Sequence, residues 1–134
     1  MCTSGYGNEA GGVRLLRLIN TQSVEIAKRE LENGDRMCLY CTGQYWVAFE
    51  HSAYFLKQFF PKAEVFTICN PNYPFTIIAA CVTVRTFNRY MLNHTAICRR
   101  DDYVEFSVSP LATRQYGDWH ARNVDELMEM QSVI

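Results

Sequence analysis

The sequence predicts a single α/β or α+β domain over residues 13–134, built as a layered fold in which helices flank a mixed β-sheet. The chain has 134 residues, which suits one compact domain, and 49% of them are hydrophobic, which is enough for a core. Strand-like and helix-like segments follow one another along the chain. No run of about 18 apolar residues occurs, so we expect no membrane span.

The first third of the chain predicts a terminal segment, a helix and a turn. Residues 1–12 are small, polar and rich in glycine, and we expect them to be disordered. The segment VEIAKREL has helical spacing, with Thr21 or Ser23 as its cap. The preceding VRLLRLI fits either a separate helix or a strand. Asn33-Gly34-Asp35 is a strong stop signal.

The next part predicts a strand that leads into a helix. Met37 to Tyr40 is apolar and extended in character, and YWVAF either continues the strand or begins the helix. Helical spacing begins at about Ala48, and Pro61 ends it. The apolar face of this helix consists of Phe49, Ala53, Leu56 and Phe60.

The second half of the chain predicts further strands and two helices. Residues 63–69 form a strand, and the nearly continuous apolar run 75–84 suits a central strand buried on both faces. Thr83 or Thr86 caps the helix that follows. TAIC, ending at Cys98, is a short strand, and the alternation in YVEFSVS predicts another. Asn123 is the expected cap of a short terminal helix.

The Cys38-x-x-Cys41 pair has the spacing of redox and zinc sites, but its context is a strand. Residues three apart in a strand point to opposite faces, so the two thiols are not expected to meet. The other four cysteines form no second pair with zinc spacing. We therefore expect buried cysteines, and a cytoplasmic thiol oxidoreductase is the least favoured of three functions.

Other catalytic and cofactor signatures are missing from the sequence. His51, His94 and His120 fit no metal spacing, and there is no P-loop, G-x-S-x-G or G-x-G-x-x-G. Asp101-Asp102 lies in a predicted turn. These observations predict a protein that is not an enzyme and needs neither metal nor cofactor. With no secretory signal and six cysteines, we expect it to reside in the cytoplasm.

The formal net charge is −1 and the isoelectric point is near 6.3, whereas a dedicated nucleic-acid binder is usually basic. Positive charge is instead local: Arg85 and Arg89 share a face of the predicted helix, and Arg99-Arg100 lies at a turn. Gathered on one side, these arginines would hold a phosphate backbone. Taken alone, they are more typical of an ordinary solvated surface.

CLYCTGQYWVAFEHSA, from Cys38 to Ala53, has an expected strand, a glycine, an aromatic residue and a helix in that order. This order resembles the opening of the N-terminal, mismatch-recognition domain of the MutS family of DNA mismatch-repair proteins. IAACVTVRTFNRYML, from Ile78 to Leu92, resembles the family's later strand–turn–helix, and TAIC sits where the family has a Val-Ala-Ile-Cys strand. The resemblance runs from about Met37 to about Cys98.

The resemblance implies a mixed sheet and a hairpin that contacts the DNA minor groove. The family's phenylalanine wedge corresponds to Tyr45, which keeps an aromatic ring, whereas its base-reading glutamate corresponds to Val47. Gln44 replaces the acid after the glycine, and Cys81-Val82-Thr83 replaces the Gly-Val-Pro turn. The family fold is therefore expected with altered reading of the base.

Two functions follow from these observations. The first is a non-enzymatic domain that binds double-stranded DNA; the second is a protein-interaction module that keeps the fold without binding DNA. The sequence leaves the oligomeric state open. The predicted nucleic-acid-binding residues are Gln44, Tyr45, Trp46, Arg85 and Arg89.

Overall fold

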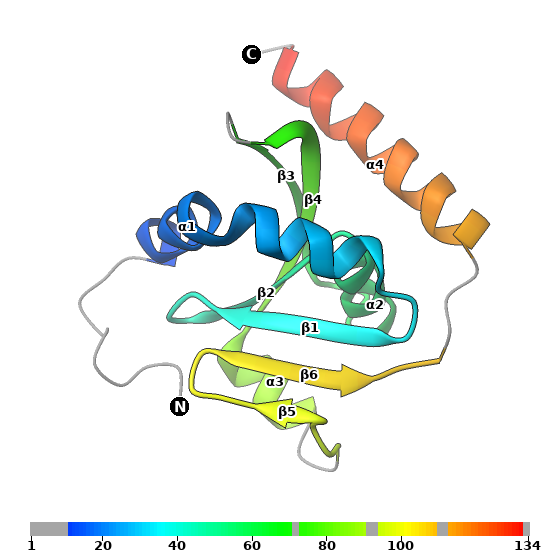
Figure 1. Ribbon diagram of the computed structural model, residues 1–134. Coiled ribbons are helices and arrows are strands. Elements are labelled where there is room, and N and C mark those ends of the chain that lie inside the picture. The colour runs from blue at the N-terminus through cyan, green and yellow to red at the C-terminus, as the bar shows by residue number, and fades with distance from the viewer. Residues whose placement is uncertain (1–10, 71–72, 91–93, 110–112, 133–134) are drawn as a thin grey trace.

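The computed structural model describes residues 11–70, 73–90, 94–109 and 113–132, and Figure 1 shows their arrangement. These described residues form four helices and six strands, with two strands after each of the first three helices. Their bounds are α1 Gly11–Leu31, β1 Arg36–Cys41, β2 Tyr45–Phe49, α2 His51–Phe59, β3 Glu64–Asn70, β4 Tyr73–Thr83, α3 Val84–Tyr90, β5 Cys98–Arg99, β6 Tyr103–Ser107 and α4 Thr113–Ser132. The protein thus has an α+β fold built on one sheet.

The sheet has the strand order β3-β4-β2-β1-β6-β5, and all of its described pairings are antiparallel. The prediction of a mixed sheet is therefore wrong. The reason lies in the connections: β1 and β2 are joined by the short turn at Gly43, and β5 and β6 by the turn at residues 100–102. Such turns join antiparallel neighbours, whereas parallel neighbours need a longer crossover.

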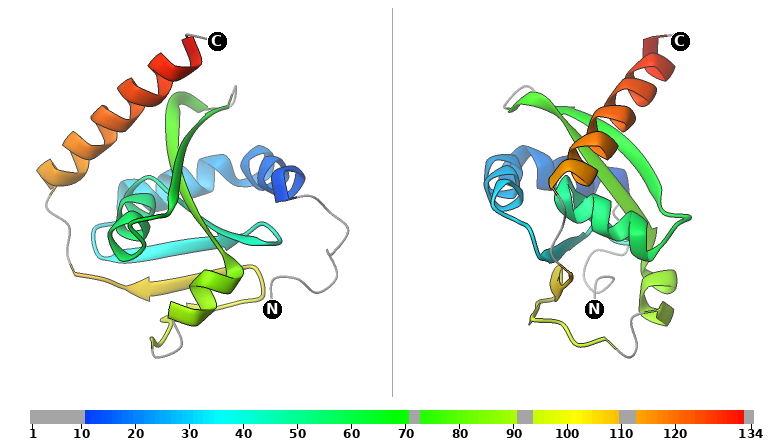
Figure 2. Two further views of the ribbon diagram at one scale, coloured as in Figure 1. Left: turned by 180° about the vertical axis from the view of Figure 1, so that it is seen from behind. Right: turned by 90° about the vertical axis from the view of Figure 1, so that its right-hand side faces the viewer.

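Helices cover both faces of the sheet (Figure 2). On one face Ile19 and Ile26 of α1 pack against alternate residues of the central strands, including Cys38 and Val47. The opposite face packs against α2, against Phe87 of α3 and against the first half of α4. Because successive strand residues point to opposite faces, the central strands are buried on both sides.

Two helices are longer than the sequence predicts. α1 runs without a break from Gly11 to Leu31, so Thr21 and Ser23 lie inside it and cap nothing. Thr21 Oγ1 instead donates to the carbonyl of Arg17, one turn earlier, at 2.7 Å. α4 is also continuous, and Asn123 Nδ2 donates to the carbonyl of Trp119 at 2.8 Å. Side chains that can cap a helix also form hydrogen bonds to the preceding turn when they lie inside a helix, so their presence in the sequence does not locate a helix end.

The middle of the chain follows the sequence pattern closely. YWVAF is the strand β2, so the prediction of a helix from about Ala48 is wrong: Phe49 lies in β2, and α2 begins at His51. The end of α2 before Pro61 is as predicted, and Ala53 and Leu56 of the expected apolar face are buried within it. Thr83 caps α3, since its Oγ1 accepts a hydrogen bond from the Thr86 N–H at 3.1 Å. Most of TAIC is not in a strand, because β5 holds only Cys98 and Arg99. Of residues 1–12, the first ten lie outside the described part, and α1 begins at Gly11.

Among the described residues, no helix combines the length and the apolar character needed to cross a membrane.

Candidate nucleic-acid interface

One end of the sheet brings together turns and a helix start that are distant in sequence. The Cys41 N–H donates to the Asp102 carbonyl at 2.9 Å, which places the β5–β6 turn beside the β1–β2 turn. The Val84 N–H donates to the Gln44 carbonyl at 2.9 Å, which places α3 on the other side. We call residues 42–45, 84–89 and 100–102 the hairpin end. Figure 1 shows both turns at the left-hand edge of the sheet.

Gly43 gives the β1–β2 turn its shape. Its φ of +100° lies in a region that residues with a side chain rarely adopt. A Cβ at this position would lie 3.5 Å from Nη1 of Arg14, so the N-terminal part of α1 also reaches this end of the sheet. The tight turn leaves the side chain of Tyr45, directly after it, 39% exposed.

Positive charge is concentrated at the hairpin end although the whole chain is slightly acidic. Arg85 and Arg89 are exposed one turn apart on α3, and Arg100 is exposed in the β5–β6 turn. The arginines in or beside the hairpin end are Arg14, Arg85, Arg89, Arg99 and Arg100, and the acids are Asp101 and Asp102. The exposed aromatic ring of Tyr45 and these arginines therefore belong to the same end of the sheet.

The five predicted binding residues do not all lie on this surface. Gln44, Tyr45, Arg85 and Arg89 are exposed there. Trp46 is only 5% exposed, because it points to the opposite face of β2 and packs on Phe87 with ring centroids 5.4 Å apart. Trp46 is therefore a core residue, and its assignment to a surface is corrected.

Val47 is also buried, beneath α1 in the same core cluster as Ile19 and Ile26. It lies on the same face of β2 as Tyr45, but α1 covers it and leaves Tyr45 uncovered. A base at the hairpin end would thus meet the Tyr45 ring and would not reach position 47.

Cys38 and Cys41 lie on opposite faces of the sheet, as the sequence predicts, and both are free thiols. Burial raises the pKa of the Cys38 thiol to about 11, so the thiol and not the reactive thiolate is present near neutral pH. The described residues also contain no group of three or more side chains that could hold a metal ion.

These positions predict that iodoacetamide near neutral pH leaves Cys38 and Cys41 unlabelled in the folded protein and labels both in urea. The half-buried Cys98 is the internal reference and should react first. Peptide mass spectrometry after timed labelling measures the three rates. Rapid labelling of Cys38 in the folded state, or a Cys38–Cys41 disulfide after mild oxidation, would contradict the assignment of both thiols to the core.

A second polar cluster was not predicted from the sequence. Glu30 is only 2% exposed, and its carboxylate accepts hydrogen bonds from the Ser52 N–H at 2.8 Å and from Ser52 Oγ at 2.7 Å. Asn33 Nδ2 donates to it at 3.2 Å. Burial raises the pKa of Glu30 to about 7, although these hydrogen bonds oppose the rise. The carboxyl group thus fixes the start of α2 from α1.

The same cluster attaches α4 to the body of the protein. Glu50, with a φ of 51°, forms the bend between β2 and α2. Its Oε2 accepts from the Tyr116 hydroxyl at 3.0 Å and lies 2.7 Å from His120 Nε2. The His51 ring stacks on Tyr116 at 3.8 Å, and burial lowers the pKa of His51. We interpret this cluster as structural.

The sequence did contain a signal for the buried acid. Ile19, Ser23, Ile26 and Glu30 follow one another at intervals of four, three and four residues, and all four are buried. Glu30 therefore continues the buried stripe of α1. An acid in that stripe indicates a buried partner, but only the fold identifies it as Ser52.

Comparison of the chain with protein-family models, with curated proteins and with solved structures finds no match. The resemblance to the MutS N-terminal domain therefore stays a prediction.

Proposed function

We propose that this protein binds double-stranded DNA through the hairpin end and catalyses no reaction. The observation that carries the proposal is the joint placement of an exposed aromatic ring, Tyr45, and the arginines of α3 and of the β5–β6 turn. Arginines contact phosphates, whereas an aromatic ring can stack on, or wedge between, bases. The motif resemblance independently points to the same hairpin.

The local arrangement supports binding despite the net charge of −1. Affinity for a phosphate backbone depends on the charges that face it, and more distant charges are screened beyond roughly 10 Å at 0.1 M salt. Lys28 and Arg122 are exposed on the C-terminal part of α1 and on α4. Both of these helical segments lie away from the hairpin end (Figure 1). We therefore expect contact through one end of the sheet only.

Replacing Tyr45 with alanine is expected to weaken DNA binding about 10-fold, because a stacked aromatic ring contributes roughly 1–3 kcal/mol per base. The loss should be larger for a duplex with a mismatch, where a base step unstacks at lower cost. Fluorescence anisotropy with labelled matched and mismatched duplexes at about 50 mM salt measures both affinities.

Tyr45→Phe is the matched control, because it keeps the ring and should keep the affinity. Thermal unfolding of both variants verifies that the exposed position tolerates the change. Wild-type binding weaker than about 1 mM at low salt would refute the proposal. Equal affinities of the wild type and Tyr45→Ala for DNA would show that Tyr45 does not contribute to the interface.

A protein-interaction module is the second candidate, and one feature of α1 favours it. Leu16, Val24 and Leu31 are 61%, 51% and 76% exposed on this helix. Exposed apolar side chains that form a contiguous patch are typical of contact surfaces. This surface belongs to α1, whose N-terminal part approaches Gly43 through Arg14, whereas Val24 and Leu31 lie farther along the helix.

A further inference from the structure

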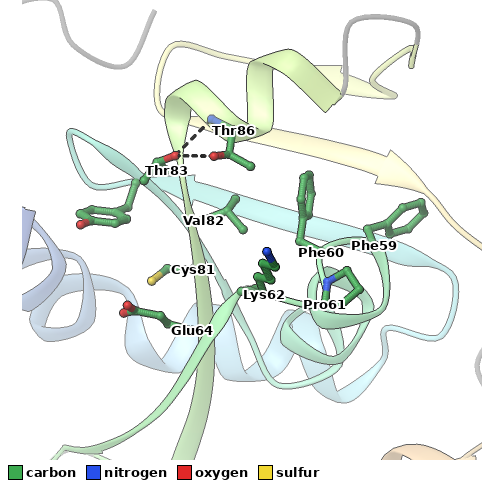
Figure 3. Close-up of a pocket in the computed structure, with 11 residues that line it drawn as sticks. Phe59, Phe60, Pro61, Lys62, Glu64, Cys81, Val82, Thr83 and Thr86 are labelled. Carbon is green, nitrogen blue, oxygen red and sulfur yellow. Dashed lines mark hydrogen bonds between the residues drawn. The ribbon is translucent and has the colours of Figure 1, made fainter.

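A pocket of about 540 Å³ opens beside the hairpin end, where the sheet loses a strand. β3 begins at Glu64, opposite Cys81, so Val82 and Thr83 of β4 extend beyond it. The space next to them is bounded by the turn 60–63 and by the start of α3. Figure 3 shows Thr83 and Thr86 at one side of this pocket and Phe60 and Pro61 at another.

The wall opposite β4 is held firmly in place. Lys57 Nζ donates to the carbonyls of Pro61 at 2.5 Å and of Ala63 at 2.9 Å. The Ala63 N–H donates to the Phe60 carbonyl at 2.8 Å, which closes the turn. A pocket with a preformed wall loses less entropy on binding than one that has to order itself.

The lining of the pocket is mostly apolar, with a few polar groups at its rim. Phe60 and Val82 are buried side chains that offer apolar surface, and Tyr45 forms part of the mouth. Lys62, Glu64, Thr83 and Thr86 are exposed at the rim and provide hydrogen-bond donors and acceptors. A flat heteroaromatic ring with polar edges matches this combination.

The pocket adjoins the arginines that would hold a phosphate. Thr86 lines the pocket, and Arg89 lies three residues later on α3, so the two are neighbours on the helix surface. A nucleotide joins a flat heteroaromatic base to a phosphate. The site therefore has one part for each component of a nucleotide.

We propose that this pocket receives one unstacked base of the bound DNA, while Tyr45 contacts the step from which the base has left. The inference rests on the DNA-binding function proposed above. It adds that the preferred DNA carries an extrahelical base, because such a base is already unpaired and leaves the stack at little cost.

Permanganate oxidation of a duplex with a single bulged thymine tests the pocket, because the reagent attacks unstacked thymine. The bulged thymine is expected to lose its reactivity when wild-type protein saturates the duplex. Thr86→Trp should fill the pocket from α3 and Glu64→Trp from β3; both positions are exposed, so the fold should tolerate them. At protein concentrations that saturate the duplex, both variants should leave the thymine reactive, and Glu64→Trp, which lies outside the hairpin end, should keep the wild-type affinity. Glu126→Trp, exposed on α4 outside the hairpin end and the pocket, makes the same replacement as Glu64→Trp; it is the control and should protect as wild type does.

The outcomes separate the two proposals. Binding of the duplex by wild type without protection of the thymine would overturn the pocket and leave DNA binding in place. Protection that persists in both Thr86→Trp and Glu64→Trp would also overturn it. If anisotropy detects no binding at low salt, the proposed function fails and the pocket assignment fails with it.

Discussion

Replacing both Arg85 and Arg89 with alanine is expected to weaken binding to duplex DNA about 100-fold at low salt, and to do so for matched and mismatched duplexes alike. Both side chains are exposed on one short helix at the hairpin end. Contacts to phosphates carry no sequence information, so the loss should be uniform across duplexes. The thermal stability should stay close to that of the wild type.

The salt dependence gives this prediction a second readout. Each phosphate contact that is lost should lower the slope of log K against log salt by roughly 0.9, so the double variant should lose about 1.8. The matched control is Lys28→Ala with Arg122→Ala, which removes the same charge from exposed positions on α1 and α4. If the control variant weakens binding as much, only the overall charge of the protein matters and α3 has no special role.

The second large effect concerns stability and pH. The pKa of Glu30 is raised by burial from its ordinary value of 4.5 to about 7, so the folded state favours the neutral carboxyl group. The contribution of Glu30 to the free energy of unfolding therefore has its full value below about pH 4.5. It is lost as the pH rises through 7, because the folded state then has to hold a buried negative charge. The free energy of unfolding falls by roughly 3 kcal/mol over this pH range because of Glu30.

Urea unfolding of Glu30→Gln at a series of pH values measures this effect. The side chain of glutamine does not ionise, so the fall in the free energy of unfolding between pH 4.5 and 8 should be smaller by roughly that 3 kcal/mol. Glu32→Gln, at an exposed position two residues later, is the control and should keep the wild-type profile. Identical profiles for Glu30→Gln and wild type would show that Glu30 does not carry the pH dependence.

Local sequence patterns predicted much of the secondary structure, because hydrophobic spacing and helix-ending residues such as proline determine it within a few residues. Pro61 marked the end of α2, and strand geometry predicted the separation of Cys38 from Cys41. The sequence offered Thr83 or Thr86 as the cap of α3, and the fold uses Thr83. The continuous lengths of α1 and α4 were missed, because residues that can cap a helix also fit inside one. Strand directions were missed since they depend on which strands pair.

The candidate site was predictable only in part for the same reason. Tyr45, Gln44 and the α3 arginines could be named from motifs, but their meeting at one end depends on the Val84–Gln44 hydrogen bond. Alternate residues of β2 point to opposite faces of the sheet, so Trp46 points to the face opposite Tyr45. Its burial can be derived only when it is known which helices cover that face. The pocket beside β4 depends on where β3 begins, and no local pattern marks that point.

Backbone amide chemical shifts recorded by NMR during titration with a short duplex test the central claim most directly, because they locate contact residue by residue. For a fully paired duplex with no extrahelical base, the expected result at low salt is a set of shifts confined to residues 42–45, 84–89 and 100–102, reversed by added salt. Shifts centred on the exposed apolar residues of α1, or no shifts at a DNA concentration of about 1 mM, would contradict DNA binding by the hairpin end.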